Sequence, residues 1–549
     1  MNPARLLPRR SDYADLPTSW RRDVLAGVTV GVVALPLALA FGISSGVGAA
    51  AGLITAVVAG VVAAVFGGSH VQVSGPTGAM AVVLAPIVAA HGLGSVALVT
   101  VVAGLLVAGC GIAGLGRTVT FIPWPVIEGF TLGIAVIIFA QQLPAALGVS
   151  APAGGRTLTT ALHVLTHADW AAAAKTLVVV GFVAVVMVAL PRLHPGAPAS
   201  LLAVVGATIG VIALHVPVAA IGELPSHLPA PVLPTVDVDS LRTLLSAAVT
   251  VAALAAIESL LSARVAATMS PTGPYDPDRE LLGQGLASVA SGVFGGMPAT
   301  GAIARTAVNV RSGARTRVAA IVHSIVLLGV VYLLSGPVSQ IPLAALAGVL
   351  MVTSFRMISA ATVRSILRSG RSDALTFVVT AVITVSFDLI EAVMIGVLAA
   401  AFFALRNVAG RSSVTREQLP GPNRDGDEHI ALLRLDGAMF FGAAERISTE
   451  IAEAFGTPGG PAAAGIRVVI IRMSQLGMLD ATGARTLAEI TAELEARGIT
   501  VIIKGVRPEH LNMITSVGVL DSLRHENHLM DSLDDAIAHA RTHVAEHPS

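Results

Sequence analysis

The sequence SGPTGAM at residues 74–80 has a counterpart, MPATGAI, at residues 297–303. Both copies contain Thr-Gly-Ala shortly after a proline, and both follow the sequence Val-Phe-Gly-Gly, at residues 65–68 and 293–296. Because the residue before a proline favours extended backbone, each copy is expected to start as a short strand and to continue as a helix. The shared order of these features predicts an internal repeat with one motif in each half.

The chain around the two motifs has the composition of a membrane protein. Of its 549 residues 54% are apolar and only 12% are charged, and the mean hydropathy is +0.80, whereas a soluble protein carries about 25% charged residues. The charges are unevenly distributed, with 27 among residues 24–405 and 33 among residues 406–549. We therefore expect a cytoplasmic arm at 1–23, a transmembrane domain at 24–406, a linker at 407–428 and a soluble domain at 429–549.

Charge and cysteine content exclude several classes of protein. The formal net charge is zero, so the chain lacks the basic excess that nucleic-acid binding requires. Cys110 is the single cysteine, which excludes an intrachain disulfide framework and a cysteine-based metal cluster. No Ser/His/Asp, Cys/His or metal-ligand cluster stands out in the apolar part, so we expect no enzyme, no catalytic residues, no cofactor and no metal site.

Fourteen apolar segments follow one another in the predicted transmembrane domain, and several are shorter than the roughly 20 residues of a full crossing. Basic residues gather in the loops after even-numbered segments, as the positive-inside rule requires if both termini are cytoplasmic. The two motifs open segments three and ten, the third segment of each set of seven, and a repeated unit of seven spans has inverted topology. The segments are 24–43, 47–66, 77–91, 95–115, 123–146, 174–190, 198–215, 241–263, 281–294, 302–311, 317–335, 342–358, 373–388 and 390–406.

Segments three and ten are expected to be half-helices that start inside the membrane. Such a start presents unpaired backbone N–H groups and the positive end of the helix dipole, and non-helical backbone at this depth must be covered by protein or line a cavity. Two starts that face each other form an anion site without a cationic side chain, and Gly78 and Gly301 would let the anion approach the backbone closely. Ordinary kinked helices with small residues for packing are the alternative, which the repetition of the motif disfavours.

Two charged residues at membrane depth are functional candidates. Glu258 lies in the middle of segment eight, and Ser262, one turn later, shares its helix face. Burial favours the neutral form of a carboxyl group, so Glu258 is the candidate proton carrier, with a purely structural carboxylate as the alternative. Arg305 either adds positive field to the anion site, pairs with Glu258 or anchors the short helix, and the sequence leaves these roles open. His323 in segment eleven is expected to be a satisfied packing residue.

These segments resemble the SulP anion permeases, the family that includes eukaryotic sulfate carriers, chloride/bicarbonate exchangers and prestin. The resemblance rests on ALPLALAFGISSG at 34–46, SGPTGAM at 74–80, ESLLS at 258–262 and FGGMPATGAIARTAVN at 294–309. It implies an all-α polytopic membrane domain with fourteen spans in a 7+7 inverted repeat, a fold shared with uracil-type nucleobase carriers. It further implies core and gate subdomains, a homodimer and an elevator-like motion that moves anions.

The resemblance also assigns site residues. Anion-pocket positions of the family match Phe41, Thr77, Gly78, Ala79, Gly301, Ala302 and Ile303, and Arg305 matches an arginine found in many members.

Departures from the family pattern bear on the coupling ion. Cyanobacterial sodium–bicarbonate carriers have Asp and Thr where this chain has Glu258 and Ser262, and a Thr in place of Ile303. A sodium site needs oxygen donors, so Ile303 disfavours sodium, and Glu258 resembles the bacterial members regarded as proton-coupled. Many animal members have Pro-Gln where this chain has Pro36-Leu37, which removes one polar group from the pocket.

The soluble tail shows alternating strand and helix patterns, which indicate a small α/β layer domain. Strands are expected at 430–435, 438–441, 466–473 and 499–504, and helices at 443–455, 481–496, 509–517 and 533–544, with a flexible connection at 456–465. The tail resembles the STAS domain that ends most SulP chains. In its MLDATG loop, residues 478–483, Ala481 takes the place of the serine that anti-sigma antagonists phosphorylate, so that switch is not expected.

The sequence therefore predicts a secondary active transporter in the cytoplasmic membrane of a bacterium. Its cargo is a small anion, either sulfate, bicarbonate or a dicarboxylate, its coupling ion is the proton, and its STAS domain is regulatory with an unknown partner. The alternatives are a sodium-coupled bicarbonate symporter, an uncoupled anion channel and an anion-responsive sensor. A channel would not need Glu258, which separates it from the carriers.

Overall fold

The structure is a computed structural model that describes residues 6–117, 123–149, 157–194, 197–234, 238–386, 389–410, 412–455 and 465–546. The chain forms two compact units, one up to residue 397 and the other from residue 398. Each is described by itself. The expected connection at 456–465 lies outside the described residues except for Gly465.

The first unit is helical, and every one of the fourteen predicted segments corresponds to a helix. Within the described ranges, seven helices are long and apolar enough to cross a membrane. Besides the predicted segments, the unit contains α6 (Thr157–His167), α13 (Ser335–Ser339) and α15 (Ala360–Ser369). The helices that correspond to the segments are α1 (Leu16–Ser44), α2 (Ala49–Phe66), α3 (Gly78–His91), α4 (Gly94–Ile112), α5 (Trp124–Leu147), α7 (Trp170–Leu193), α8 (Ala199–Ala213), α9 (Val238–Met269), α10 (Pro277–Val293), α11 (Ile303–Arg311), α12 (Val318–Leu333), α14 (Leu343–Met357), α16 (Arg371–Ser386) and α17 (Leu389–Gly410).

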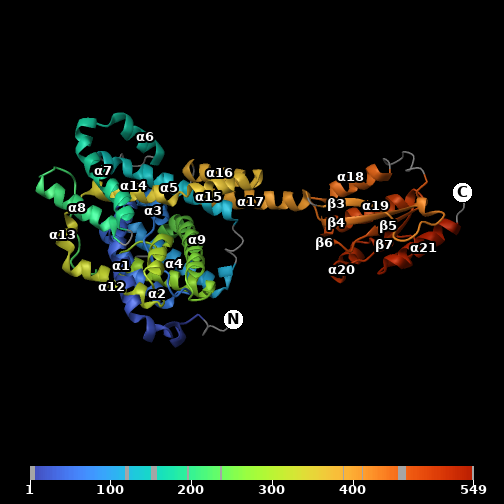
Figure 1. The fold of residues 1–549 in the computed structure, drawn as a ribbon, viewed down its shortest axis with the longest axis horizontal. Coiled ribbons are helices and arrows are strands. Elements are labelled where there is room, and N and C mark those ends of the chain that lie inside the picture. Colours follow the sequence, from blue (N-terminus) through green and yellow to red (C-terminus); the bar gives the residue numbers. More distant parts are fainter. Residues whose placement is uncertain are drawn as a thin grey trace. The chain divides into compact units, whose positions relative to one another are not determined.

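The helices of this unit fall into two packed groups. In the first group α1 lies along α2 and α12, α10 lies between α4 and α2, and α9 packs against α4 and α11. In the second group α5 contacts α14 and α16, and α7 contacts α14 and α8. Figure 1 shows α1, α2, α4, α9 and α12 gathered together, with α5, α7, α14 and α16 beside them.

Small residues allow the close approach of α1 and α2. A Cβ atom at Gly52 would lie 2.0 Å from the Ala38 carbonyl oxygen and 3.0 Å from the Gly42 Cα. These are backbone atoms of two packed helices, so no side-chain rotation can relieve the contact. Glycine at position 52 therefore sets the distance between α1, which carries Phe41, and α2.

Gly52→Val is expected to lower the free energy of unfolding by about 3 kcal/mol, because overpacking forces the two backbones apart. The measurement is thermal unfolding of the purified chain in detergent, with Gly329→Val in α12 as the matched control. A Cβ at Gly329 meets no atom within 4 Å, so that variant should unfold at the temperature of the wild type. Equal unfolding temperatures for the two variants would contradict this account.

The second unit contains a six-stranded sheet with helices on both faces. The strand order is β3-β4-β5-β7-β8, with β6 paired to β4; the β3–β4 pair is antiparallel, and the other pairs are parallel. One face buries apolar side chains of α18, α19 and α20, and the other buries those of α21. The elements are β3 (Ser413–Glu417), β4 (Ile430–Met439), α18 (Ala444–Phe455), β5 (Val468–Arg472), β6 (Leu476–Leu479), α19 (Ala481–Ala496), β7 (Thr500–Lys504), α20 (Pro508–Ser516), β8 (Leu529–Met530) and α21 (Leu533–Glu546).

The structure differs from the predicted tail in its strands. The two strands expected at 430–435 and 438–441 form one strand, β4, and β6 and β8 were not predicted. The segment expected as a linker, 407–428, contains β3, which pairs with β4 from Ser413↔Asp436 to Glu417↔Leu432. All four helices are present where expected to within two residues, and Asp480 caps α19 by accepting a hydrogen bond from the Gly483 N–H at 2.7 Å.

Candidate anion and proton site

The two repeated motifs meet in the first unit. β1 (Ser74–Gly75) pairs antiparallel with β2 (Thr300–Gly301), with Ser74 opposite Gly301 and Gly75 opposite Thr300. Immediately after these strands, α3 starts at Gly78 and α11 at Ile303. The strand-then-helix order expected from the sequence is thus present in both copies, and the antiparallel pairing brings the two helix starts into one region.

Neither helix start is capped by a side chain. The N-cap residues are Thr77 for α3 and Ala302 for α11, and neither makes a side-chain cap hydrogen bond. The first backbone donors that close an intrahelical turn are the N–H groups of Ala81, 3.0 Å from the Thr77 oxygen, and Thr306, 2.9 Å from the Ala302 oxygen. The N–H groups before them have no partner within the helix, and together with the helix dipoles they favour a negative charge.

Glu258 on α9 joins the two motifs. Its Oε2 atom accepts hydrogen bonds from Thr77 Oγ1 at 2.9 Å and from Thr300 Oγ1 at 2.8 Å, and the two hydroxyl oxygens lie 3.0 Å apart. Thr77 would ordinarily cap α3, but its hydroxyl is directed to the carboxyl group instead. The side chain of Glu258 is half-buried, whereas Thr77 and Thr300 are buried. The three residues therefore form one polar cluster at the strand crossing.

The sequence analysis expected Ser262 beside Glu258, and the structure shows a different partner. Ser262 is fully buried, and its hydroxyl has no hydrogen-bond partner among the described residues. The hydroxyls that contact Glu258 come from Thr77, which was predicted, and Thr300, which was missed although it lies in the repeated motif. Ser259 was also missed: its Oγ accepts the Gly301 N–H at 3.2 Å.

Arg305 links the second motif to the first. It is 2% exposed, and its Nη2 donates to the Pro76 carbonyl oxygen, while its Nη1 has no hydrogen-bond partner among the described residues. Within the described part of the chain the guanidinium is therefore not hydrogen-bonded to Glu258. The arginine holds the start of α3 in place and leaves its buried Nη1 amino group available.

Two further side chains of α11 bind the same extended segment. Thr306 Oγ1 accepts the Val73 N–H at 3.0 Å, and Asn309 Nδ2 donates to the Val71 carbonyl oxygen at 2.8 Å. The ARTAVN sequence thus acts as a clamp on residues 71–76, with Arg305, Thr306 and Asn309 as its contacts. The two halves of the repeat are joined by side chains as well as by the β1–β2 pair.

The glycines of the motif face protein. A Cβ at Gly78 would lie 2.4 Å from Ile138 Cδ1 and 3.2 Å from Phe41 Cε1, and a Cβ at Gly301 would lie 1.7 Å from Gln72 Nε2. The sequence analysis gave these glycines the role of admitting an anion to the backbone. In the structure they admit neighbouring side chains, so tight packing explains both positions.

The other predicted pocket residues divide by exposure. Phe41, Ala79 and Ala302 are buried, whereas Ile303 is 38% exposed at the first position of α11. The Ala302 N–H donates to the Val73 carbonyl oxygen at 2.9 Å, so it is not free for a ligand. Phe41 lies against Gly78, at the start of α3.

His323 departs from its expected role as a satisfied packing residue. It is fully buried in α12, and neither ring nitrogen has a hydrogen-bond partner among the described residues. The prediction of burial is correct, and the prediction of satisfied hydrogen bonds is wrong.

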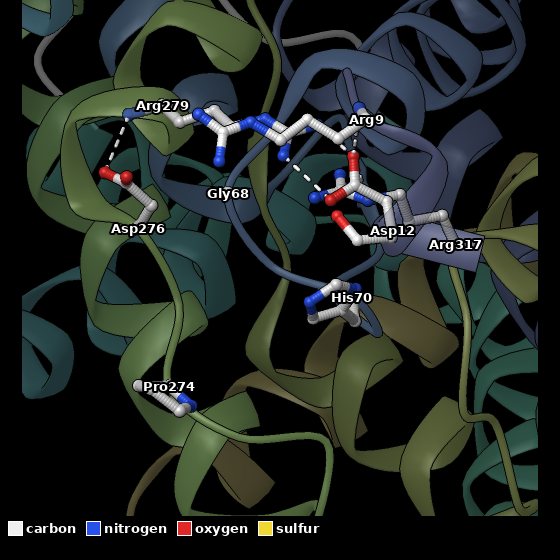
Figure 2. A pocket seen from close by; sticks show the side chains of 9 residues that line it. Arg9, Asp12, Gly68, His70, Pro274, Asp276, Arg279 and Arg317 are labelled. Atoms are coloured by element: carbon white, nitrogen blue, oxygen red, sulfur yellow. Dashed lines mark hydrogen bonds and ion pairs between the residues drawn. The ribbon is translucent and has the colours of Figure 1, made fainter. Parts of the chain in front are cut away.

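A separate pocket contains a network of buried charges. It is lined by Arg9, Ser11, Asp12, Gly68, His70, Pro274, Asp276, Arg279 and Arg317, none of which belongs to the central cluster. Figure 2 shows Asp12 and Arg279 turned toward each other. Arg279 Nη1 donates a hydrogen bond to Asp12 Oδ1 at 3.0 Å, and Nη2 donates one to Oδ2 at 2.6 Å. Arg317 Nη1 donates to the Ala64 and Gly67 carbonyl oxygens. The network ties the N-terminal arm to α10.

Asp12→Asn is expected to lower the free energy of unfolding by about 2 kcal/mol at pH 7. Burial of Asp12 opposes its ionisation, but hydrogen bonds from Arg279 and the Arg9 N–H and the charge of Arg317 lower its pKa to about 2. Because the folded pKa lies below the unfolded value, this stabilisation is present above about pH 4 and is lost as the pH falls toward 2. Thermal unfolding of wild type and variant between pH 7 and pH 2 measures it.

The exposed Asp15 supplies the control, because Asp15→Asn should leave the unfolding temperature unchanged. A difference between wild type and Asp12→Asn that persists undiminished at pH 2 would show that the effect is not electrostatic.

Comparisons with known proteins agree with this architecture. The family model described as "Sulfate permease family" matches residues 20–380, and the STAS domain model matches residues 422–536. YvdB of Bacillus subtilis, provisionally named as a sulfate transporter, is 32% identical over 94% of this chain and 97% of that protein. The bicarbonate transporter BicA of Synechocystis is 32% identical over 95% of each chain.

Solved structures show the same fold. The murine Solute Carrier 26 family member A9 anion transporter, in the inward-facing state, superimposes with a TM-score of 0.83 at 18% identity, over 98% of this chain and 94% of that chain. The transmembrane domain of a cyanobacterial BicA superimposes with a TM-score of 0.63 at 33% identity, over 70% of this chain and 98% of that chain.

The family models and the relatives define the class: a multi-pass membrane protein of an anion-transporter family, with a STAS domain after the membrane domain, and not an enzyme. The chain belongs to the sulfate permease (SulP) family.

Proposed function

We propose that the protein carries a small oxyanion across the cytoplasmic membrane of a bacterium together with a proton. The observation that carries this proposal is the contact of Glu258 with Thr77 and Thr300, the threonines of the two repeated motifs. The anion binds at the starts of α3 and α11, where unpaired N–H groups and helix dipoles favour negative charge. Glu258, hydrogen-bonded at the same crossing, takes up the proton.

Charge repulsion couples the two events. An anion and an ionised Glu258 at one low-dielectric site repel each other strongly, so the bound anion favours protonated Glu258. By reciprocity the protonated carboxyl group favours anion binding to the same extent. Thr77 and Thr300 can serve both states, because a hydroxyl donates to a carboxylate and can also accept from a carboxylic acid. The loaded site then holds one anion and one proton.

The packing around the site supports an elevator motion. Arg305, Thr306 and Asn309 clamp residues 71–76, and β1 pairs with β2, so the starts of α3 and α11 move as one body. We infer fourteen spans in a 7+7 inverted repeat with both termini cytoplasmic. The first helix group, together with α3 and the β1–β2 pair, moves against the second, and the carrier works as a homodimer in the lipid bilayer.

Sulfate and bicarbonate are the first cargo candidates, and a short dicarboxylate is the third. The relatives named above carry the words sulfate and bicarbonate in their names. Phe41 beside Gly78, and Ile303 at the start of α11, give the pocket an apolar side. Selectivity between these anions depends on the size and lining of the pocket.

A sodium-coupled bicarbonate carrier is the second candidate, favoured by the three clustered oxygens of Glu258, Thr77 and Thr300 and by the similarity to BicA. In the structure these oxygens are hydrogen-bonded to one another at 2.8 to 3.0 Å, which leaves no room for a sodium ion between them. The side chain of Ile303 offers no oxygen donor, and Ser262 Oγ makes no hydrogen bond to Glu258 among the described residues. We therefore propose the proton as the coupling ion.

Proteoliposomes that contain a pH-sensitive dye test this function. Sulfate, bicarbonate, chloride, succinate and fumarate are added one at a time outside, without sodium, with a tracer control for bicarbonate because CO₂ crosses lipid unaided. Internal acidification with one anion identifies the cargo and supports proton symport. Tracer uptake that appears only after sodium is added, without any pH change, would favour the sodium-coupled candidate.

A further inference from the structure

Three histidines lie together in the STAS domain, outside the transport site. His539 and His543 are one turn apart on α21, and His528 ends the short 3-10 helix before β8. His543 Nε2 lies 3.2 Å from His528 Nε2 and 3.2 Å from His539 Nε2. One ligand nitrogen from each ring lies within 4.8 Å of those of the others, so three imidazoles of one domain converge.

Hydrogen bonding alone does not account for this arrangement. An imidazole nitrogen has either one in-plane N–H or one in-plane lone pair, so His543 Nε2 makes a good hydrogen bond to only one of its two neighbours. The other neighbouring Nε2 atom then lies 3.2 Å from His543 Nε2 without a hydrogen bond to it. A cation that accepts a lone pair from the Nε2 atom of each ring satisfies these three nitrogens at once.

The distances suit a tetrahedral metal ion. Zinc–nitrogen bonds of about 2.0–2.1 Å in tetrahedral geometry place ligand nitrogens about 3.3 Å apart. Two of the three nitrogen–nitrogen distances are 3.2 Å, and a small rotation of a half-exposed ring brings the third pair closer. Imidazole nitrogen suits zinc, copper and nickel, whereas magnesium and calcium prefer oxygen.

The three histidines differ in burial, so the cluster is covered on the side of His528 and accessible on the side of His539 and His543. His528 is fully buried, so its ring has a fixed place, and a metal ion binds such a ring through the lone pair of a neutral imidazole nitrogen. His539 and His543 are half-buried and leave access for an ion and for a water molecule as fourth ligand.

We propose that His528, His539 and His543 bind a divalent transition-metal ion of the zinc class in the STAS domain. The ion ties α21 to the chain before β8, and so fixes the C-terminal helix on the sheet face that it covers. This gives the STAS domain a ligand that is independent of the transported anion. The sequence analysis predicted no metal site. His528 lies eleven positions before His539 in the sequence, and a histidine pair at i, i+4 alone is a weak signal.

The experiment uses the full chain in detergent without a polyhistidine tag, stripped of metal with a chelator and then titrated with Zn²⁺ alone. Bound zinc is counted by mass spectrometry after gel filtration, and the dissociation constant is measured by competition with a chromophoric chelator. The test variant is H539A/H543A. The matched control is H163A/H167A, which removes another i, i+4 pair whose rings stack with centroids 4.2 Å apart but which has no third histidine in the described residues nearby.

The wild type and the control are expected to bind one zinc ion per chain with a dissociation constant below about 1 μM, and H539A/H543A is expected to bind at least about 100-fold more weakly. Replacing zinc by Co²⁺ should give the intense visible absorption of a tetrahedral site in the wild type and not in the test variant. The apo forms of all three proteins should have the same circular dichroism spectrum, which separates lost ligands from lost folding.

Less than one fifth of an equivalent of zinc on the wild type, or equal affinities of wild type and H539A/H543A, would overturn the proposal. Loss of the ion from the control and not from the test variant would place the site elsewhere and overturn it equally. Should H539A/H543A unfold, H539Q alone, at a half-exposed position, is measured instead with the same expected loss.

Discussion

Glu258→Gln is expected to abolish the internal acidification that anion entry causes in proteoliposomes, with a loss of at least about 100-fold in the proton flux. Glutamine is nearly the same size as glutamate, and its amide oxygen can still accept from Thr77 and Thr300 (contacts of 2.9 and 2.8 Å in the wild type). The amide cannot take up and release a proton, so only coupling is removed. The measurement is dye fluorescence after addition of the cargo anion, with tracer exchange of the same anion in parallel.

Tracer exchange should survive in Glu258→Gln, because a neutral side chain at position 258 imitates the protonated state that favours the bound anion. Glu128→Gln is the matched control: Glu128 lies on α5, accepts a hydrogen bond from its own neighbour Trp124 Nε1 at 3.1 Å, and should transport as the wild type does. Persisting acidification in Glu258→Gln would exclude this residue as the proton carrier.

Arg305→Met is expected to reduce anion uptake by at least about 30-fold, since it removes both the bond to the Pro76 carbonyl oxygen and the buried positive charge. Breaking a buried charged hydrogen bond costs about 2–3 kcal/mol, and the start of α3 loses one of its contacts with α11. Initial rates of tracer uptake over a range of anion concentrations, normalised to the amount of folded transporter, give KM and the maximal rate.

Arg305→Lys separates the two contributions. An ammonium group keeps the charge but lacks the forked donors of a guanidinium, so this variant should recover KM if Arg305 acts through its field, and should remain impaired in maximal rate if the clamp on residues 71–76 matters for movement. We expect KM within about threefold of the wild type and a reduced maximal rate. Wild-type kinetics in Arg305→Met would refute both roles.

Local sequence features predicted the helices and the strand-then-helix order of the two repeated motifs. Composition separated the membrane part from the tail, apolar segments located the fourteen helices, and prolines 76 and 298 predicted the strand-then-helix breaks. These features act over a few residues, because backbone preference and hydrophobic burial are decided locally. The resemblance to SulP chains added the family, which the comparisons confirmed.

Long-range contacts could not be predicted in the same way. The partner of Glu258 was sought one turn away on its own helix, at Ser262, whereas Thr300 reaches it from another element. The pairs Asp12–Arg279 and Arg305–Pro76 each join positions more than 200 residues apart in the sequence. The local spacing of apolar and polar residues does not indicate such contacts. In the tail, β3 is as long as β5 and β7 but has no buried residue, so it lacks their apolar pattern. The strands β6 and β8 have only four and two residues, too few for a clear pattern.

Accumulation of the anion against its gradient tests the central claim most directly. Proteoliposomes in sodium-free buffer are given an acidic outside, and the uptake of labelled cargo anion is followed with and without a protonophore. The account predicts uptake above equilibrium that the protonophore abolishes, and no accumulation in Glu258→Gln despite continued exchange. Two results would contradict the account: accumulation that is independent of the pH gradient and requires sodium, or accumulation that persists in Glu258→Gln.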